Sequence, residues 1–272
     1  VGTTHAQVAD HAVFVGRYDT MLVHYYLTDT QPITPEVIDQ IHAAVANLAT
    51  PWEVLTMAAL SKELGEARAE ELMGKYASAF EPVYQQMNPP SRTVKDLQLL
   101  ELIGGTTQVL ADVFVDDKDR VNLRIYQSRD IILSDILPVL DNFGLIVIDQ
   151  YSDEVRPLGA PVANLDTFRL RGVWGVKESE ILERAQKLVE GLQAVFERKV
   201  PDDVLNRVLL RADVPWDAVD LLRAYHGYAR QLGLRFTLSR VQEIMLAQPQ
   251  VVRLLWAWFQ ARFDPNQGGH RE

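Results

Sequence analysis

The segment VNLRIYQSRDIILSDILPVLDNFGLIVIDQY, residues 121–151, decides the fold predicted for this chain. Apolar and polar residues alternate over 121–126, which indicates a strand. The polar DDKD turn at 116–119 separates this strand from another strand-like run at 107–115. The two runs therefore predict a hairpin.

The rest of this segment predicts a helix and further strands. Ser134 is expected to cap a helix that ends at Gly144, and a Leu/Ile/Val strand follows it. A second strand is predicted at 164–173 and a helix at 177–198. The order strand, helix, strand, strand, helix is the main part of a ferredoxin-like βαββαβ unit, whose two helices should cover one face of an antiparallel sheet.

The N-terminal part predicts a hairpin followed by helices. Residues 12–28 are rich in β-branched and aromatic residues and have a turn at 16–19. Thr34 precedes Pro35 at the start of an amphipathic helix, and a second helical run is expected from Pro51 to Phe80.

Prolines and glycines divide the remainder. Pro82 and the cluster at 88–90 are expected to end the helical run, a short helix follows at 93–103, and Gly104-Gly105 is read as a domain boundary. The predicted fold class is α+β, with ferredoxin-like (ACT-like) units and antiparallel sheets followed by a small all-helical domain. The expected domains are 1–103 (α+β, ACT-like and helix-rich), 104–200 (ACT-like) and 201–272 (helical).

Composition predicts a folded, soluble and cytoplasmic protein. The chain is 47% hydrophobic and 24% charged and has no cysteine, so disulfides and thiolate metal sites are excluded. It has neither a secretory leader nor about 18 uninterrupted apolar residues, so no membrane association is expected. Because it opens with Val1, the chain is interpreted as a piece of a longer polypeptide.

The charge pattern argues against nucleic-acid binding. The net charge is −10, and even the most basic part, residues 201–272, carries nine Arg against eight acidic residues. Binding to phosphates needs a concentrated positive surface, which neither part supplies.

Motifs for common catalytic chemistry are absent from the sequence. Gly104-Gly105 and the GVWG of 172–175 lack the strand-to-helix setting of a nucleotide fingerprint, and no GxxxxGK[ST], HExxH or GxSxG pattern occurs. The six histidines are scattered, and the acidic turn at 116–119 is interpreted as solvated rather than as a cation site. We therefore predict no catalytic residue, no metal site and no cofactor within this segment.

Two blocks carry a family resemblance. Residues 122–157 resemble the LSDxLPxLENxGLxVIDE run and its YEVRP end in the large-subunit class of NAD-dependent glutamate dehydrogenases. Residues 206–265 are similar to that family's NxLVLxAGLxWREVxLLRAY helices and their ARFDP ending, and residues 21–100 resemble it more loosely. The two blocks stand in the family's order.

The resemblance implies a non-catalytic regulatory and oligomerisation segment that precedes the catalytic domain. The full-length enzyme would deaminate L-glutamate to 2-oxoglutarate with NAD, and its catalytic lysine motif has no counterpart here. Implied partners are the remainder of the same polypeptide, including its catalytic domain, further copies in a homo-oligomer and an amino-acid effector. Two alternatives remain: a free-standing amino-acid-sensing or partner-binding ACT-like module, and a small enzyme with an unrecognised site.

Two candidate sites follow. A ligand position is predicted at the strand-to-helix turn Gln127, Ser128, Arg129 and Asp130, although a solvated turn is the simpler interpretation because no glycine lets a ligand approach the backbone. The last helix has one apolar face formed by Val252, Leu255, Trp256, Phe259 and Phe263. Leu254 and Trp258 lie on a neighbouring face and are predicted to form an interface.

Overall fold

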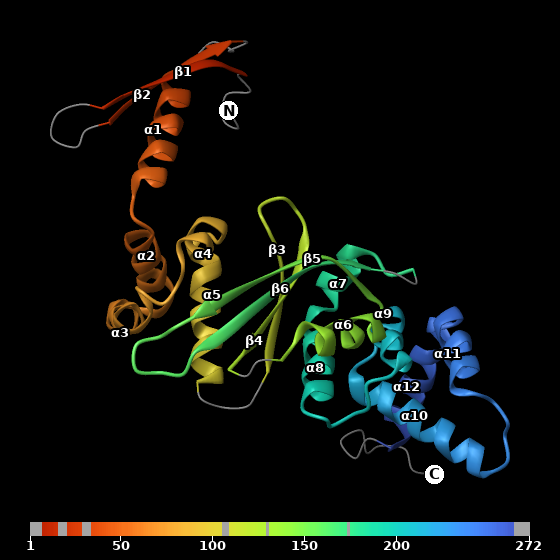
Figure 1. Ribbon diagram of the computed structural model, residues 1–272. Coiled ribbons are helices and arrows are strands. Elements are labelled where there is room, and N and C mark those ends of the chain that lie inside the picture. The colour runs from red at the N-terminus through yellow and green to blue at the C-terminus, as the bar shows by residue number, and fades with distance from the viewer. Residues whose placement is uncertain are drawn as a thin grey trace. The chain divides into compact units, whose positions relative to one another are not determined.

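The computed structural model describes residues 7–15, 21–28, 34–104, 109–128, 131–172 and 175–263 (Figure 1). The side chains of residues 21, 44 and 47–49 are also outside this description. The chain forms two compact units that divide between Glu70 and Glu71. This division differs from the boundaries expected at 103 and 200, which remain predictions.

The first unit begins with the predicted hairpin. Strand β1 (Gln7–Val15) pairs antiparallel with β2 (Met21–Thr28), while the expected turn at 16–19 lies outside the described residues. Helix α1 (Pro35–Ala49) follows, and the Thr34 hydroxyl accepts a 3.4 Å hydrogen bond from the Val37 backbone N–H as a cap. The prediction of a hairpin and an amphipathic helix is confirmed.

The helical run predicted from 51 to 80 is not continuous. Helix α2 (Trp52–Leu64) ends at Gly65, whose φ of 85° is in the left-handed region, and α3 (Glu66–Tyr76) begins directly after it. A glycine tolerates this backbone conformation because it has no Cβ. The prediction missed this break and extended the helix too far.

The prolines after α3 start helices, although the sequence pattern had suggested that they end one. Helix α4 (Pro82–Met87) and helix α5 (Pro90–Ile103) both have proline at the start of the first turn. The missing N–H of proline costs nothing there because the first helical N–H groups have no intrahelical partner.

A four-stranded antiparallel sheet forms the centre of the second unit. Its order is β3 (Leu110–Val115), β4 (Val121–Gln127), β6 (Ala163–Gly172) and β5 (Leu145–Val155). The predicted α+β class and hairpin are confirmed. The last strand of a βαββαβ unit would pair beside β4, and β3, which precedes the unit, occupies that edge.

One face of the sheet is covered as predicted. Helices α6 (Leu133–Asn142), α7 (Glu178–Glu183) and α8 (Ala185–Phe196) pack on it, and Leu123 and Phe168 lie fully buried in the shared core. The helix predicted over 177–198 is interrupted at Arg184. Ser134 is not the cap of α6, because the helix starts at Leu133 and Ile132 occupies the cap position.

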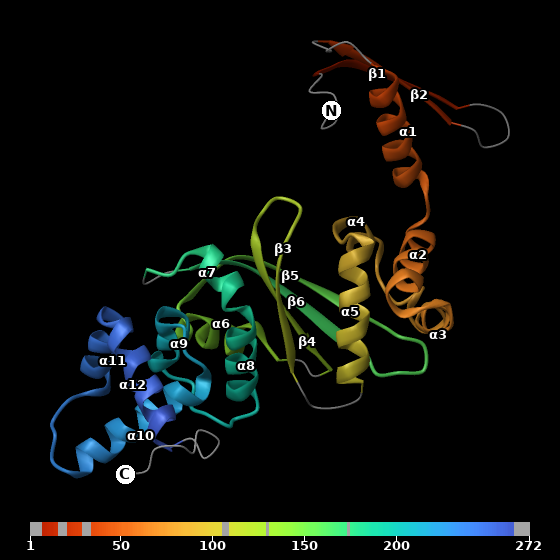
Figure 2. The same cartoon turned by 180° about the vertical axis from the view of Figure 1, so that it is seen from behind.

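The other face of the sheet is covered at β4 by α5. Figures 1 and 2 show α5 on one side of the strands and α6 and α8 on the opposite side. As a result, every residue of β4 is buried, whereas a sheet with one covered face would leave alternate residues exposed.

The C-terminal part is helical, as predicted. It comprises a short 3-10 turn (Val204–Asn206), α9 (Arg207–Ala212), α10 (Trp216–Gln231), α11 (Leu238–Ala247) and α12 (Pro249–Phe263). Helix α9 is its buried centre and contacts α8, α10, α11 and α12. Throughout the described ranges, no helix combines the length and apolar character needed to cross a bilayer.

Candidate functional site

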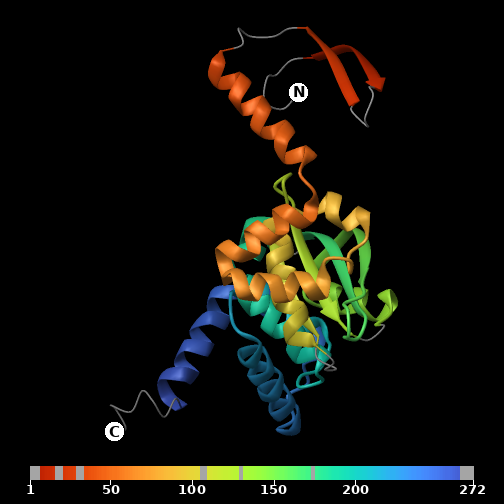
Figure 3. The same cartoon turned by 90° about the vertical axis from the view of Figure 1, so that its left-hand side faces the viewer.

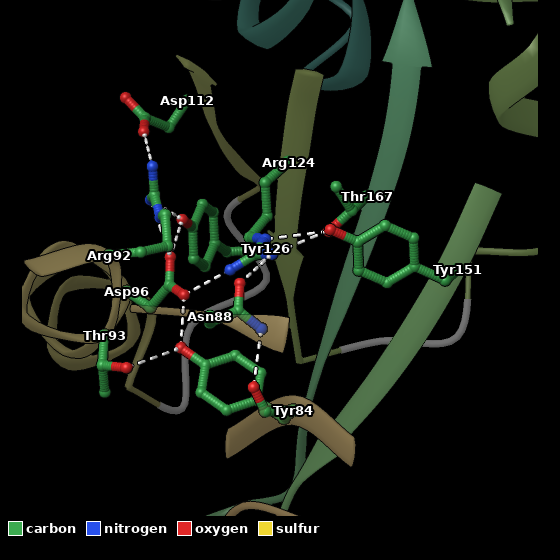
Figure 4. Close-up of polar contacts among 10 residues, drawn as sticks. All are labelled: Tyr84, Asn88, Arg92, Thr93, Asp96, Asp112, Arg124, Tyr126, Tyr151 and Thr167. Carbon is green, nitrogen blue, oxygen red and sulfur yellow. Dashed lines mark hydrogen bonds and ion pairs between the residues drawn. The ribbon is translucent and has the colours of Figure 1, made fainter. Parts of the chain in front are cut away.

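A cluster of polar side chains, buried except at its edge, lies between α5 and the face of β4 that it covers (Figure 4). Along β4, Leu123 and Ile125 point into the apolar core, so the alternation of the strand places Arg124 and Tyr126 on the opposite face. We call this group the polar cluster. It consists of Tyr84, Asn88, Arg92, Thr93, Asp96, Asp112, Arg124, Tyr126, Tyr151 and Thr167.

Asp96 is the centre of the polar cluster and has no exposed surface. Its Oδ2 accepts a 2.5 Å hydrogen bond from the Tyr84 hydroxyl, and its Oδ1 accepts one of 2.5 Å from the Tyr126 hydroxyl. Arg92 Nε donates to Oδ1 at 2.8 Å, and Arg124 Nη1 forms an ion pair with Oδ2. Both carboxylate oxygens therefore receive charged and neutral donors at once.

Arg124 is fully buried, and besides Asp96 it contacts residues of β6 and of the α4–α5 connection. Its Nε donates to the Thr167 hydroxyl on β6 at 2.8 Å, and its Nη2 donates to Asn88 Oδ1 after α4 at 2.8 Å. Burial by itself lowers the pKa of this guanidinium, but the charge of Asp96 raises it above its ordinary value. Arg124 thus stays charged and ties β4 to β6 and to the α4–α5 connection.

Arg92 completes the charge balance of the cluster. Its Nη1 donates to Asp112 Oδ2 on β3 at 2.5 Å, and its Cζ lies 4.3 Å from the centre of the Phe114 ring. The cluster therefore contains two guanidiniums, Arg92 and Arg124, and two carboxylates, Asp96 and Asp112. A buried set with equal charges of both signs avoids the large cost of an isolated buried ion.

The chemistry of the polar cluster suits a rigid joint better than a catalytic centre. Burial and the charge of Asp96 raise the pKa values of Tyr84 and Tyr126 well above the ordinary tyrosine value, so both hydroxyls remain hydrogen-bond donors. A general base or nucleophile near neutral pH would need a pKa shifted in the opposite direction. The cluster instead joins α4 and α5 to the sheet.

Asp153, on the same face of the sheet, is less well satisfied. Its Oδ2 is buried and has no hydrogen-bond partner among the described residues. Burial raises the pKa of this carboxyl, and Arg124 only partly offsets that rise. The charged form of Asp153, at the border of the polar cluster, is therefore poorly stabilised.

The predicted ligand position at the strand-to-helix turn is only partly described, because Arg129 and Asp130 lie outside the described residues. Gln127 is buried, its Nε2 donates to Asp166 at 2.6 Å, and its Oε1 accepts a 3.2 Å hydrogen bond from the Ile131 backbone N–H. The Gln127 side chain therefore braces the turn. Ligand binding at Gln127 to Asp130 stays a prediction, and it would have to use other groups of this turn.

The acidic turn at 116–119 is organised by its own hydrogen bonds. The Asp116 carboxylate accepts hydrogen bonds from the backbone N–H groups of Lys118 and Arg120 and from the Arg120 side chain. Burial would raise the pKa of Asp116, but these donors outweigh it and lower the pKa to about 2. Across the described ranges, no three His, Asp or Glu side chains are grouped so that they could hold a metal ion.

A second feature is an apolar groove of about 340 Å³ between α10, α11 and α12. Its lining is almost wholly apolar or aromatic, with His226 and Arg230 as the polar exceptions. The principal lining residues are Leu221, Leu222, Tyr225, Leu234, Phe236, Val241, Met245, Leu255, Trp256, Trp258 and Phe259. We call this feature the apolar groove.

The predicted interface residues are exposed. Leu254 is 70% and Trp258 58% accessible, and Trp258 lies on the groove. The face expected to be core is only partly so: Val252 is buried, but Leu255 and Phe263 are exposed. That part of the prediction was only partly right, because Trp256 and Phe259 are half-buried and full cover by the described helices is limited to the start of α12. In Figure 3 this last helix, in the deepest blue, extends away from its neighbours.

Sequence reasoning missed the polar cluster. The alternation over 121–126 was interpreted only as a strand, and no role was predicted for Arg92 or Asp96. The sequence did contain a signal. An arginine and a tyrosine on one face of a strand can form an ion pair and a hydrogen bond with an aspartate on a preceding helix.

Three family models match the chain. Residues 59–103 match helical motif 2 of glutamate dehydrogenase, residues 112–181 match its ACT3 domain, and residues 200–265 match its helical motif 3. The ACT3 match covers most of the four-stranded sheet. Residues 59–103, predicted above as part of a first ACT-like domain, match a helical motif.

Curated relatives are similar to the chain along most of its length. The NAD-specific glutamate dehydrogenase of Halomonas elongata is 28% identical over 234 residues, which is 85% of this chain and 14% of the relative. Those of Mycobacterium tuberculosis and Pseudomonas aeruginosa are 27% and 24% identical, over 85% and 82% of this chain, and it again spans 14% of each. The chain therefore belongs to the large NAD-specific glutamate dehydrogenase family, of which it spans helical motif 2, the ACT3 domain and helical motif 3.

Proposed function

We propose that this chain is a non-catalytic regulatory and oligomerisation segment of an NAD-dependent glutamate dehydrogenase. The complete enzyme would convert L-glutamate, NAD and water to 2-oxoglutarate, ammonia and NADH, with the chemistry performed by a catalytic domain outside this chain. Its partners would be the remainder of the same polypeptide and further copies in a homo-oligomer. An amino-acid effector would act through the ACT3 sheet.

The observation that carries this proposal is the polar cluster. It joins helical motif 2, through Arg92 and Asp96 of α5, to the ACT3 domain, through Arg124 and Tyr126 of β4. We expect two family segments that share one buried, charge-balanced joint to move together. Such a joint can transmit a change at the ACT3 sheet to the helices, which is what a regulatory segment requires.

The exposed face of α12 supports the architectural part of the proposal. Leu254 and Trp258 are large apolar side chains without cover among the described residues. Contiguous exposed apolar surface of this kind marks interaction sites in soluble proteins. We assign them to a contact with the rest of the enzyme or with another subunit.

The test has two arms. The purified chain, given L-glutamate and NAD, should form no NADH above the level of a blank, and glutamate-dependent NADH formation would refute the non-catalytic assignment. In the full-length enzyme, Arg124→Met should change the response of the rate to added amino acids or the oligomeric state.

A matched control distinguishes the joint from a general effect of charge removal. Arg240→Met removes an exposed arginine that, among the described residues, forms an ion pair only with exposed Glu243, so it should leave both properties unchanged. If Arg124→Met leaves the amino-acid response and the assembly as they were, the regulatory role of the joint is contradicted.

A further inference from the structure

Several large apolar side chains that line the apolar groove remain exposed to solvent. Of its lining, Tyr225 is 48%, Leu255 47% and Phe236 56% accessible. Burial of a side chain of this size stabilises a protein, so several such side chains exposed side by side leave a large stabilising contribution unused. A groove of this kind is suited to apolar side chains supplied from outside.

The surroundings of the groove are strongly cationic. From Arg223 to Phe263 the sequence has six arginines and one acidic residue, Glu243, although the whole chain has a net charge of −10. Glu243 is paired with Arg240 at 2.9 Å. Arg223 is likewise paired with Asp203 and Asp220. The arginines without an ion pair among the described residues include Arg230, Arg235 and Arg262.

Three of these arginines border the groove. Arg230 lines it, and together with Arg235 it also lines an adjoining polar hollow of about 560 Å³. Arg262 lies 5.9 Å from the centre of the Trp258 ring at the other side. None of the three forms an ion pair with another residue of the described ranges. Within the described residues, the rim therefore presents guanidiniums without a carboxylate partner beside an apolar floor.

A small molecule suits the groove less well than a helix does. Ligand pockets combine an apolar lining with a few convergent polar groups that fix the orientation of the ligand. Here the His226 Nε2 is already 3.1 Å from the Phe236 carbonyl oxygen, and the arginines lie at the rim. Apolar side chains recurring along one face of a helix would fill the floor, and acidic residues beside that face would meet the rim.

We propose that the apolar groove binds an acidic amphipathic helix, whose apolar face contacts Tyr225, Leu255 and Trp258 and whose flanking carboxylates pair with Arg230, Arg235 and Arg262. This inference is independent of the proposed glutamate dehydrogenase activity. It rests on the shape and the charge of one surface.

Calorimetric titration of the 272-residue chain with two synthetic helical peptides tests the proposal. Both peptides carry Leu and Phe at i, i+3, i+4 and i+7, and one has Glu and the other Lys at the positions that flank this stripe. The Glu peptide should bind on the order of tenfold more tightly than the Lys peptide, and the difference should shrink with added salt. Equal binding of both peptides, or no binding of the Glu peptide, would overturn the proposal.

Variants of the chain locate the site. Arg230→Gln combined with Arg235→Gln should weaken binding of the Glu peptide on the order of fivefold, and Leu255→Asp should abolish it. Arg240→Gln, which alters an arginine already paired and outside the lining, should change nothing. Leu255 is exposed, so its replacement leaves the fold intact, which circular dichroism verifies.

A second copy of the chain is the competing occupant. Sedimentation of the chain without peptide should show no association that Leu255→Asp abolishes. A dimer that Leu255→Asp dissociates, combined with failure of the Glu peptide to bind, would assign the groove to self-association and overturn the proposal.

Discussion

The polar cluster beneath α5 and the apolar groove beside α12 reverse the usual distribution of residues. In the cluster, Arg124 and Asp96 have no exposed surface, while at the end of the chain Leu254 and Trp258 are 70% and 58% accessible. Charged side chains are ordinarily exposed and large apolar ones buried. One part of the molecule thus buries its charges, and the other part exposes its hydrophobic residues.

The difference lies in where the partners of each group are found. Each charge of the cluster meets an opposite charge on another element of the same unit, as Arg124 does with Asp96. The groove lacks such partners among the described residues, so several of its apolar side chains stay exposed. A charged side chain can therefore be buried where its partners are present, and a large apolar side chain stays exposed where nothing packs against it.

The largest expected effect comes from breaking the polar cluster. Arg124→Met should lower the free energy of unfolding by about 3 to 5 kcal/mol, because it leaves the carboxylate of Asp96 buried with half of its charge compensation. Urea denaturation of the chain measures the change. Arg240→Met, at an exposed ion pair, should cost less than about 1 kcal/mol, and a similarly small loss for Arg124→Met would show that the cluster is not a joint.

A smaller loss is expected from a single hydroxyl of the cluster. Tyr126→Phe removes the donor to Asp96 and the acceptor for Arg92, both at 2.5 Å, and should cost about 1 to 3 kcal/mol. Tyr228→Phe is the matched control, since Tyr228 is 59% accessible. Equal unfolding midpoints for the two variants would contradict the assignment of Tyr126 to the cluster.

Replacement of Asp153, at the edge of the polar cluster, is expected to stabilise the protein. Burial raises the pKa of this carboxyl in the folded state, so the folded protein binds the proton more tightly than the unfolded chain does. The contribution of Asp153 to the stability of the wild type therefore rises as the pH falls through this raised pKa. Asp153→Asn should be more stable than wild type at pH 7, by at most about 1 kcal/mol.

This advantage should shrink as the pH falls, because the wild-type carboxyl becomes neutral as well. Chemical denaturation of both proteins at neutral and at acidic pH measures the difference. A destabilised Asp153→Asn variant at pH 7 would mean that the carboxylate is favourably bound in the folded state, against the absence of a partner for its Oδ2.

The smallest effect is expected at the exposed face of α12. Replacing both Leu254 and Trp258 with Ser should change the stability of the chain by less than about 0.5 kcal/mol, because neither side chain is buried. Val252→Ala, at a buried position of the same helix, should cost roughly 1.5 kcal/mol. If the double variant unfolds more readily than Val252→Ala, Leu254 and Trp258 are core residues and their assignment to an interface fails.

The local sequence pattern predicted most of the helices and strands, but little of how they pack against one another. The hairpin of β3 and β4, helix α6 and strands β5 and β6 follow from periodicity and turn residues close together in the chain. The break at Gly65 and the helix starts at Pro82 and Pro90 were read wrongly. A proline or glycine indicates that a helix begins or ends nearby, but the residue alone does not show which of the two occurs.

The sequence by itself determined the α+β class, the helical C-terminal part and the excess of apolar surface on α12, because each depends on the spacing of residues within one element. Only the tertiary structure decided that Arg124 and Asp96, which are 28 residues apart, share a buried ion pair. It also decided that Leu255 faces an open groove. Periodicity states which side of an element is polar, but not whether water or another element lies against that side.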